Sequence, residues 1–371
     1  MPGGNDPYLL PNGTLRNKLG LTNQDELQRA ENRITAARGA LLERDLPGPP
    51  FTFDTLKAVH FELFQDVYAW AGQARTTPLA KREHDHPASL VQAFASPDTI
   101  TPHAEAVFKQ LAARDFLAGT SPAAFSAGAT ETFVGLNGVH FAREGNGRSQ
   151  RLLLAAIARH AGHTLAFDVV TRERMVAVSV AAHKGDSSGV RRMFDEILDR
   201  RQVDAMRKAL GFLERSGAVP WNDLYIATTR AGQEYDGTLV GRAGADFMLR
   251  ASAKAGEPRI LIGDAVDLPP ATASGDRVRL RASRFLPPTN LPGPSPAAAA
   301  APSRAGTSVL GAILNAVREP EPAPPAAASL IDRLRAFEDR KDAEHEAVPK
   351  TEETPGPEPD GTPRPRPGPK P

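Results

Sequence analysis

The segment from residue 140 to residue 151, HFAREGNGRSQR, gathers residue types suited to handling a phosphate group. Gly145 and Gly147 flank Asn146, so the backbone there can turn sharply and an anion can approach it closely. An apolar run follows, which places this turn directly before a predicted helix. The free N–H groups and the positive dipole end at the start of a helix make an anion site. The segment therefore predicts phosphate binding where a loop enters a helix.

Four charged or titratable side chains accompany the predicted turn. Arg148 and Arg151 lie three positions apart on the first helical turn, so both face the same way and can fork onto phosphate oxygens. Glu144 is a hard oxygen ligand suited to a magnesium ion that bridges two phosphates. His140 titrates near neutral pH and can take a proton from an alcohol. Together they predict transfer of a phosphorus group from a nucleotide to a hydroxyl.

The elements that must position these residues are helices, predicted over residues 20–213. Leu27, Ile34 and Leu41 share one predicted helix face. Ser121-Pro122 is a good helix start, because serine caps the first turn and proline fits within it. A further apolar stripe at helical spacing consists of Leu56, Val59, Leu63, Phe64, Val67 and Trp70. The pattern predicts a bundle of mostly apolar, buried helices.

Residues 217–285 change to short strand-like runs between Gly, Pro and Asp turns. These runs are Leu224 to Thr229, Thr238 to Val240, Phe247 to Leu249, Arg259 to Ile262 and Arg277 to Leu280. Five short strands predict a small β-barrel of the oligonucleotide/oligosaccharide-binding (OB) type. Few aromatic residues are available there for base stacking, so we do not expect nucleic acid as a partner. Residues 286–371 hold 19 of the 34 prolines and predict a disordered tail.

The bulk composition excludes several classes of protein. The chain has no cysteine, which excludes disulfides, thiolate metal sites and cysteine nucleophiles. Lys and Arg number 45 against 44 Asp and Glu, a balance that gives no case for a general polyanion binder. The longest apolar run, 152–158, is too short to span a bilayer, and the N-terminus has no secretory pattern. We expect a cytoplasmic protein with no membrane partner, and export without a cleaved signal stays open.

The segment at 140–151 resembles the signature of Fic-domain proteins, in which His, an acidic residue, Gly-Asn-Gly-Arg and a second Arg recur in this order. LNGV at 136–139 precedes the motif as it does in that family, and residues 61–81 and DPYLLPNGTLRNKLGL near the N-terminus also look like family sequence. The resemblance implies a mainly α protein in three parts: a Fic helical bundle with a β-hairpin flap at 5–213, the OB-like domain at 217–285 and the tail at 286–371.

The resemblance also implies a protein adenylyltransferase, with ATP as substrate and Mg²⁺ as cofactor. By position, His140 would deprotonate the target hydroxyl, which attacks the α-phosphate, while Glu144 holds magnesium and pyrophosphate leaves. Gly147 favours nucleotidyl transfer, because a related toxin subclass has lysine there, binds ATP reversed and phosphorylates instead. The implied phosphate pocket and its clamps are Gly145, Asn146, Gly147, Arg148 and Arg151.

Family members hold the target segment by strand addition to a flap, which by position falls within residues 76–95. Lys81 matches a basic flap position and is implied to cover the nucleotide. His84 and His86 lie in the same region, but no third residue stands nearby to complete a metal site. The chain departs from the family in one aromatic residue, because the ring usually found two positions after the histidine is here Phe141, one position after it. A ring placed one position early points elsewhere unless the loop shifts.

Many Fic proteins block themselves with a helix carrying Ser or Thr, three further residues, then Glu and Gly or Asn. Glu-Gly or Glu-Asn occurs only at Glu31-Asn32 and Glu144-Gly145, and neither has Ser or Thr at the required spacing. The hypothesis follows that a small antitoxin protein inhibits in trans, by pairing a glutamate with Arg151. Outside the motif, we interpret three residues as ordinary helix-face histidines: His60, His160 and His163.

Two alternatives to an adenylyltransferase stay open. The same site can transfer another nucleotide, such as that of UTP or GTP. A degenerate Fic site can instead leave a binding or effector module that acts through residues 217–285, and it would show no magnesium-dependent ATP binding. The order of a Fic domain and an OB-like domain resembles effectors delivered by type IV secretion systems. Those effectors usually continue into a helical delivery domain, which is not recognisable here.

Overall fold

The computed structural model describes residues 6–82, 91–216, 221–251, 259–283 and 285. Contacts divide the chain into two units, Met1–Gly306 and Thr307–Pro371, and all the helices and strands given below belong to the first. The predicted tail and the histidines His84 and His86 lie outside the described residues. In the described part of the chain, no helix is long and apolar enough to cross a membrane.

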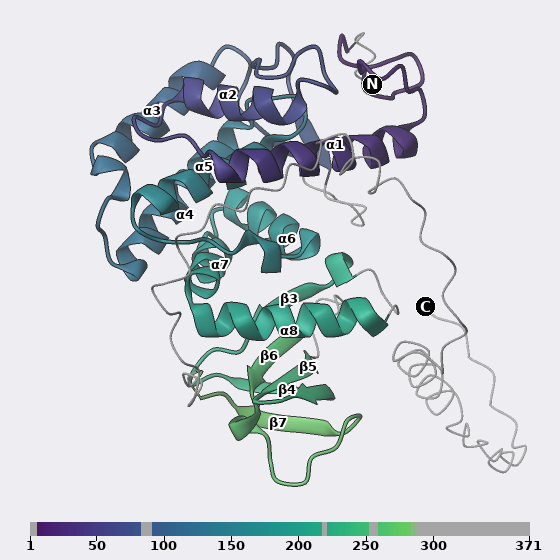
Figure 1. The fold of residues 1–371 in the computed structure, drawn as a ribbon, viewed down its shortest axis with the longest axis vertical. Helices are drawn as coiled ribbons and strands as arrows, with labels where there is room; N and C mark the ends of the chain where they lie inside the picture. The colour runs from purple at the N-terminus through teal and green to yellow at the C-terminus, as the bar shows by residue number, and fades with distance from the viewer. Residues whose placement is uncertain (1–5, 83–90, 217–220, 252–258, 284, 286–371) are drawn as a thin grey trace, which may run out of the picture. The chain divides into compact units, whose positions relative to one another are not determined.

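Helices dominate the region up to residue 216 (Figure 1). Asn23 begins the first helix, because its side chain accepts the N–H groups of Asp25 and Glu26. Ser121 caps another in the same way, with Pro122 as its first residue, which confirms the predicted start. The described α-helices are α1 Gln24–Arg44, α2 Phe53–Phe64, α3 Ile100–Ala112, α4 Pro122–Val139, α5 Asn146–His160, α6 Arg172–His183, α7 Ser188–Leu198 and α8 Arg200–Ser216.

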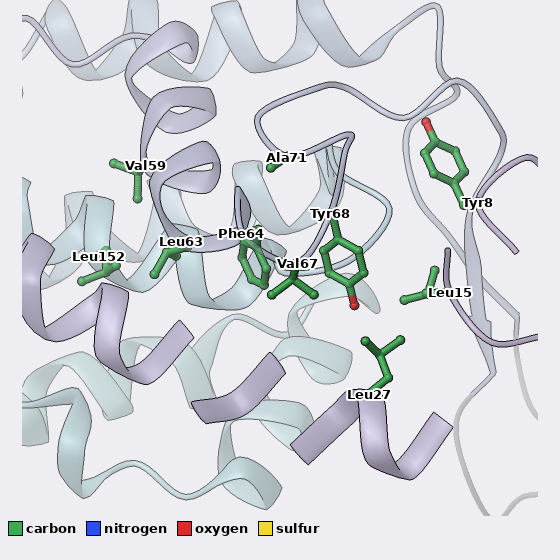
Figure 2. Close-up of a cluster of buried hydrophobic side chains, with 10 residues drawn as sticks. All are labelled: Tyr8, Leu15, Leu27, Val59, Leu63, Phe64, Val67, Tyr68, Ala71 and Leu152. Carbon is green, nitrogen blue, oxygen red and sulfur yellow. The ribbon is translucent and has the colours of Figure 1, made fainter. Parts of the chain in front are cut away.

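Two details of the first helices differ from the sequence prediction. α2 ends at Phe64, so Val67 and Trp70 lie in the turns that follow and not on the helix. These turns still carry core residues, because Val67 is fully buried with Phe64 and the other side chains in Figure 2. Leu41, expected on the inner face of α1, is half exposed. The buried residues of α1 are Leu27, Glu31 and Thr35, so its inner face is partly polar.

A two-stranded flap follows the turns after α2. β1 Ala80–Arg82 pairs antiparallel with β2 Val91–Ala93, with Ala80 opposite Ala93. The predicted flap region therefore contains two paired strands, and residues 83–90 between them lie outside the described residues. The chain returns from β2 to α3 and then to α4, which ends beside the candidate site.

The second region is a five-stranded sheet. Its strands are β3 Tyr225–Thr228, β4 Glu234–Ala243, β5 Asp246–Ala251, β6 Arg259–Asp264 and β7 Arg277–Arg281. The spatial order is β3-β6-β5-β4-β7, with β3 parallel to β6 and the other pairs antiparallel. Among the described residues no ladder joins β3 to β7, so the sheet is open at that point and does not close as a barrel would.

The prediction of a mainly helical protein with a small β region of five strands is confirmed. α8 ends at Ser216 and β3 begins at Tyr225, close to the predicted change in character. α8 contacts β3 and β6, and α6 also contacts β3. Because both regions belong to one compact unit, their division into separate domains at 213 and 217 stays a prediction.

Candidate active site

The candidate site lies where α4 ends and α5 begins. His140 is the C-cap of α4, with a left-handed backbone (φ 45°, ψ 61°) and an N–H that donates to Leu136 O at 3.0 Å. Gly145 is the N-cap of α5 at φ 86°, a conformation that glycine adopts without strain. A Cβ at this position would also overlap the Phe64 ring, so two constraints require glycine here. The predicted loop that enters a helix is confirmed, with His140 at its start.

The Asn146 side chain stabilises the loop from within. Its Oδ1 accepts the N–H of Ala142 at 2.9 Å, and its Nδ2 donates to the carbonyl of Ala142 at 2.7 Å. Because the amide is buried and used in these two bonds, Asn146 can offer a phosphate its backbone N–H, as can Gly147 beside it. The start of α5 therefore offers main-chain donors at the position where an anion site is predicted.

Phe141 lies in the core even though its ring stands one position early. It is 1% exposed and packs edge-on against Phe53 and His60, with ring centroids 5.4 and 5.3 Å away. Ala142, where the family usually has the ring, is also fully buried. The aromatic contact that holds the loop in the core is thus retained by the neighbouring residue.

His60 supports the loop from below and is not the ordinary helix-face histidine that we expected. It is fully buried, and its Nδ1 accepts the N–H of Gly72 at 2.9 Å. The other ring nitrogen must then carry the proton, and Nε2 donates to the carbonyl of Glu144 at 2.9 Å. Burial lowers the pKa of His60 to about 4, with a further contribution from the charge of Arg148, so the ring is neutral at physiological pH.

Glu144 keeps part of its carboxylate available. Oε1 accepts the N–H of Gly145 at 2.9 Å and lies 3.6 Å from Arg148 Nη2, and the side chain is 35% exposed. No group of three or more His, Asp or Glu residues able to hold a metal ion is found in the described part of the chain. A single carboxylate next to a phosphate site nevertheless fits magnesium, which often binds one carboxylate together with substrate phosphates.

The two arginines of the motif differ in what they contact. Arg148 is bound by the protein: its Nη2 pairs with Glu31 Oε1, its Nη1 donates to Thr35 Oγ1 at 3.1 Å, and its guanidinium lies 4.7 Å from the Phe64 ring centroid. Arg151 pairs with no carboxylate among the described residues. Burial and the nearby charge of Arg148 lower the pKa of Arg151 to about 10, so it remains positively charged at neutral pH.

The arginine without a carboxylate points toward the start of its own helix. A Cβ added at Gly147 would lie 3.5 Å from Arg151 Nη1, which places this guanidinium beside the first turn of α5. The structure therefore brings the Arg151 guanidinium to the N-terminal N–H groups of α5. Glu144 lies directly before Gly145, the N-cap of this helix. This arrangement can receive a polyphosphate and a hard cation.

Comparison with known proteins agrees with this geometry. The Fic/DOC family matches residues 50–158, a segment that includes α2 and nearly all of α5. A probable protein adenylyltransferase of Sinorhizobium fredii, y4lH, is 36% identical over 197 residues, which make up 51% of this chain and 95% of that protein. The chain belongs to the Fic/DOC family.

Other similarities of this Fic/DOC protein reach beyond its helical region. A protein adenylyltransferase of Bartonella henselae is 30% identical over 293 residues, covering 75% of this chain and 52% of that protein. The solved structure of the type IV secretion system effector protein BepA is similar with a TM-score of 0.66 and 29% identity, covering 75% of this chain and 96% of that one. The chain spans about half the length of the first two curated relatives that it matches.

The Fic/DOC motif also depends on residues that the sequence analysis missed. Glu31 is buried on α1, where one carboxylate oxygen pairs with Arg148 and the other accepts the hydroxyl of Tyr68. Burial, with Glu31 close by, raises the pKa of Tyr68. The signal was present in the spacing, since Leu27, Glu31 and Thr35 recur every fourth residue and place a carboxylate on a buried helix face.

Lys81 is the one predicted site residue that cannot be related to the others by its side chain. It lies on β1 opposite Gln92 of β2, and its side chain is outside what the structure describes. The remaining predicted residues, from His140 to Arg151, all lie on one loop and the first turns of α5.

Proposed function

We propose that this Fic/DOC protein is a protein adenylyltransferase, which transfers AMP from ATP to a Ser, Thr or Tyr hydroxyl of a target protein and releases pyrophosphate. The observation that carries this proposal is the available Arg151 guanidinium beside the N-terminus of α5, which follows a loop that begins at His140 and contains Glu144. The names of the curated relatives y4lH and the Bartonella henselae protein support the same activity.

Each residue of the loop then has one role. His140 takes the proton of the attacking hydroxyl as a general base. The N–H groups at the start of α5, with Arg148 and Arg151, hold the phosphates and compensate the charge that develops on them. Mg²⁺, held by Glu144 and the phosphates, would supply further positive charge to the leaving pyrophosphate. Gly147 leaves the space beside Arg151 open for the nucleotide.

The test uses two labels on the nucleotide. Purified protein is incubated with magnesium, a cell lysate and ATP labelled on either the α- or the γ-phosphate. We expect α-label on a protein band and no γ-label, and loss of the α-label with His140→Ala. His163→Ala is the matched control, because His163 Nε2 donates to Thr120 O, away from the loop. Transfer of γ-label would show a kinase, and the absence of magnesium-dependent ATP binding would show a degenerate binding module.

The nucleotide itself is tested in the same assay by competition. UTP and GTP are added in excess, because the motif contacts the phosphates and leaves base selection to other residues. We propose ATP as the preferred substrate, so unlabelled ATP should suppress the label more strongly than UTP or GTP does.

We further propose that the target docks by strand addition on the flap formed by β1 and β2, and that a small antitoxin inhibits in trans. The first proposal is supported by the position of the flap, because Phe94, directly after β2, contacts His140. The second is supported by Arg151, which has no described carboxylate partner. If the purified chain is active only after part of the chain itself is removed, inhibition in trans is wrong.

By analogy with BepA, named a type IV secretion system effector, we propose delivery into a target cell.

A further inference from the structure

Arg75 is a buried arginine that binds main-chain carbonyls. It is 2% exposed, and no carboxylate pairs with it in the described part of the chain. Nε donates to the carbonyl of His140 at 2.9 Å, and Nη2 lies 3.4 Å from that of Val139. A cation bound to the last carbonyls of α4 is favourable, because a helix C-terminus carries partial negative charge. The same residue also donates its own N–H to Phe141 O at 2.8 Å.

The same guanidinium reaches both ends of the flap. Nη1 donates to the carbonyl of Thr77 at 2.9 Å, before β1, and Nη2 donates to the carbonyl of Ala95, after β2. Ala95 is also joined to α4 directly, because its N–H donates to Gly138 O at 3.1 Å. One side chain therefore connects the start of the flap, the end of the flap and the peptide that carries His140.

Phe94 makes the second connection. Its N–H donates to Leu79 O at 3.3 Å, so its backbone continues the pairing of the flap by one residue. Its ring stacks on the imidazole of His140, with centroids 3.9 Å apart and an angle of 18° between the planes. Its centroid is 5.8 Å from that of His183, at an edge-on angle of 67°. His140 is itself only 8% exposed, so the Phe94 ring is part of what fixes the plane of its imidazole.

These contacts matter because the backbone of His140 is in an unfavourable conformation. A non-glycine residue at φ 45° persists only when its surroundings hold it there. These surroundings include the Arg75 guanidinium on the carbonyl and the Phe94 ring on the side chain. Both contacts originate from the flap or its two ends.

We propose that Arg75 and Phe94 are positioning residues that hold the His140 imidazole in its plane and couple it to the flap, so that a target strand docked on β1 and β2 acts on the base through them. This rests on the proposed adenylyl transfer. Neither residue touches the anion site at the start of α5 by any described contact, so the coupling affects the base and leaves nucleotide binding unchanged.

The first experiment is independent of catalysis. NMR spectra are recorded on the full chain with labelled histidine, and the His140 signals are identified by their loss in His140→Ala. We expect Phe94→Leu, which keeps most of the volume but has no ring, to shift the His140 signals, and Phe94→Tyr to retain them. Phe61→Leu is the matched control, because Phe61 is 45% exposed on α2. Unchanged His140 signals in Phe94→Leu would overturn the proposal.

The second experiment uses a target protein found by the labelling assay. Phe94→Leu should lower kcat about 10- to 100-fold, because a small misplacement of a reacting group has effects of this size, with KM for ATP unchanged. Phe94→Tyr should restore most of the rate. Addition of the target should shift the His140 signals of the wild type more than those of Phe94→Leu. Arg75→Lys keeps the charge but cannot reach all its carbonyls, and it should behave like Phe94→Leu.

The outcomes distinguish this proposal from the proposed function. If the wild type transfers no AMP to any protein, the proposed function fails, while the NMR comparison still decides whether Phe94 holds His140. If the wild type is active and Phe94→Leu matches it in kcat and in its response to the target, the coupling is wrong. If Arg75→Lys does not fold, Phe94→Leu carries the test by itself.

Discussion

Two buried clusters of arginine and glutamate show what separates a structural contact from a binding site. At the contact with the sheet, Glu196 of α7 lies between Arg174 and Arg192. Its Oε2 is 2.8 Å from Arg174 Nη1 and accepts the N–H of Thr228 on β3 at 3.3 Å, and its Oε1 is 2.7 Å from Arg192 Nε. Each charge in this cluster has an opposite charge in contact.

At the start of α5, the cluster of Glu31, Arg148 and Arg151 has one arginine without a carboxylate in contact. Glu31 and Arg148 compensate each other, but Arg151 next to them has no described carboxylate and Glu144 is partly exposed. A ligand with negative charge and a hard cation would complete both. The composition of a buried ion cluster therefore says little about function, whereas uncompensated charges beside it indicate a binding site.

The largest effect is expected in the complete cluster. Glu196→Ala leaves Arg174 and Arg192 buried without a carboxylate, so the free energy of unfolding should fall by about 3–5 kcal/mol. Urea unfolding measures it, with Asp195→Ala as the matched control, because Asp195 pairs with Arg191 at the surface and should contribute about 0–1 kcal/mol. Equal losses in the two variants would contradict the role given to Glu196.

The free energy of unfolding should depend on pH through His60, which supports the loop before α5. Its pKa of about 4, below the ordinary 6.5, means that the unfolded chain binds the extra proton more readily. The stability that this provides is fully present above pH 6.5 and is lost as the pH falls toward 4, by about 3 kcal/mol. Unfolding of the wild type and of His60→Gln measured across this range should diverge above pH 4 and become parallel above pH 6.5. Parallel curves throughout would show that His60 is not held neutral.

A smaller effect is expected from the glycines of the turn. Gly145→Ala combines a positive φ with overlap on the Phe64 ring, and it should lower the free energy of unfolding by about 2 kcal/mol. It should also weaken phosphate binding. Gly147→Ala is the matched control, because its Cβ would meet Arg151 at an ordinary 3.5 Å and should change stability by less than about 1 kcal/mol. Thermal unfolding of both variants measures the two effects. A loss at Gly147→Ala as large as that at Gly145→Ala would contradict the special role of the turn at Gly145.

The smallest effect sharpens the contrast most directly. Arg151→Met removes a largely buried charge that lacks a described carboxylate, so stability should stay the same or rise by up to about 1 kcal/mol. ATP affinity, measured by calorimetry with magnesium, should fall about tenfold, since a charge-assisted bond to phosphate is lost. A loss of stability comparable to that of Glu196→Ala would mean that Arg151 is part of a structural cluster.

The sequence predicted the motif, the five strands and most helices because these depend on local spacing. The predicted end of α2 was wrong, because Val67 and Trp70 keep an apolar pattern at helical spacing although they lie in the turns after the helix. His60 and Glu31 were missed for another reason. Their roles depend on bonds to Glu144 and Arg148, which lie far along the chain, and a buried polar residue on an amphipathic helix looks like any other polar residue until its partner is placed.

The position of Glu31 has a practical consequence for anyone who wishes to produce a smaller version of this protein. Glu31 lies on α1, before the segment 50–158 by which the family is recognised, yet it accompanies Arg148 inside that segment. A fragment that contained only residues 50–158 would lack Glu31 and Thr35, which bind Arg148. The Arg148 side chain would then be exposed to water, and nothing on α1 would fix its orientation. Dissection of the protein should therefore begin upstream of α1, so that the first helix travels with the motif that it completes.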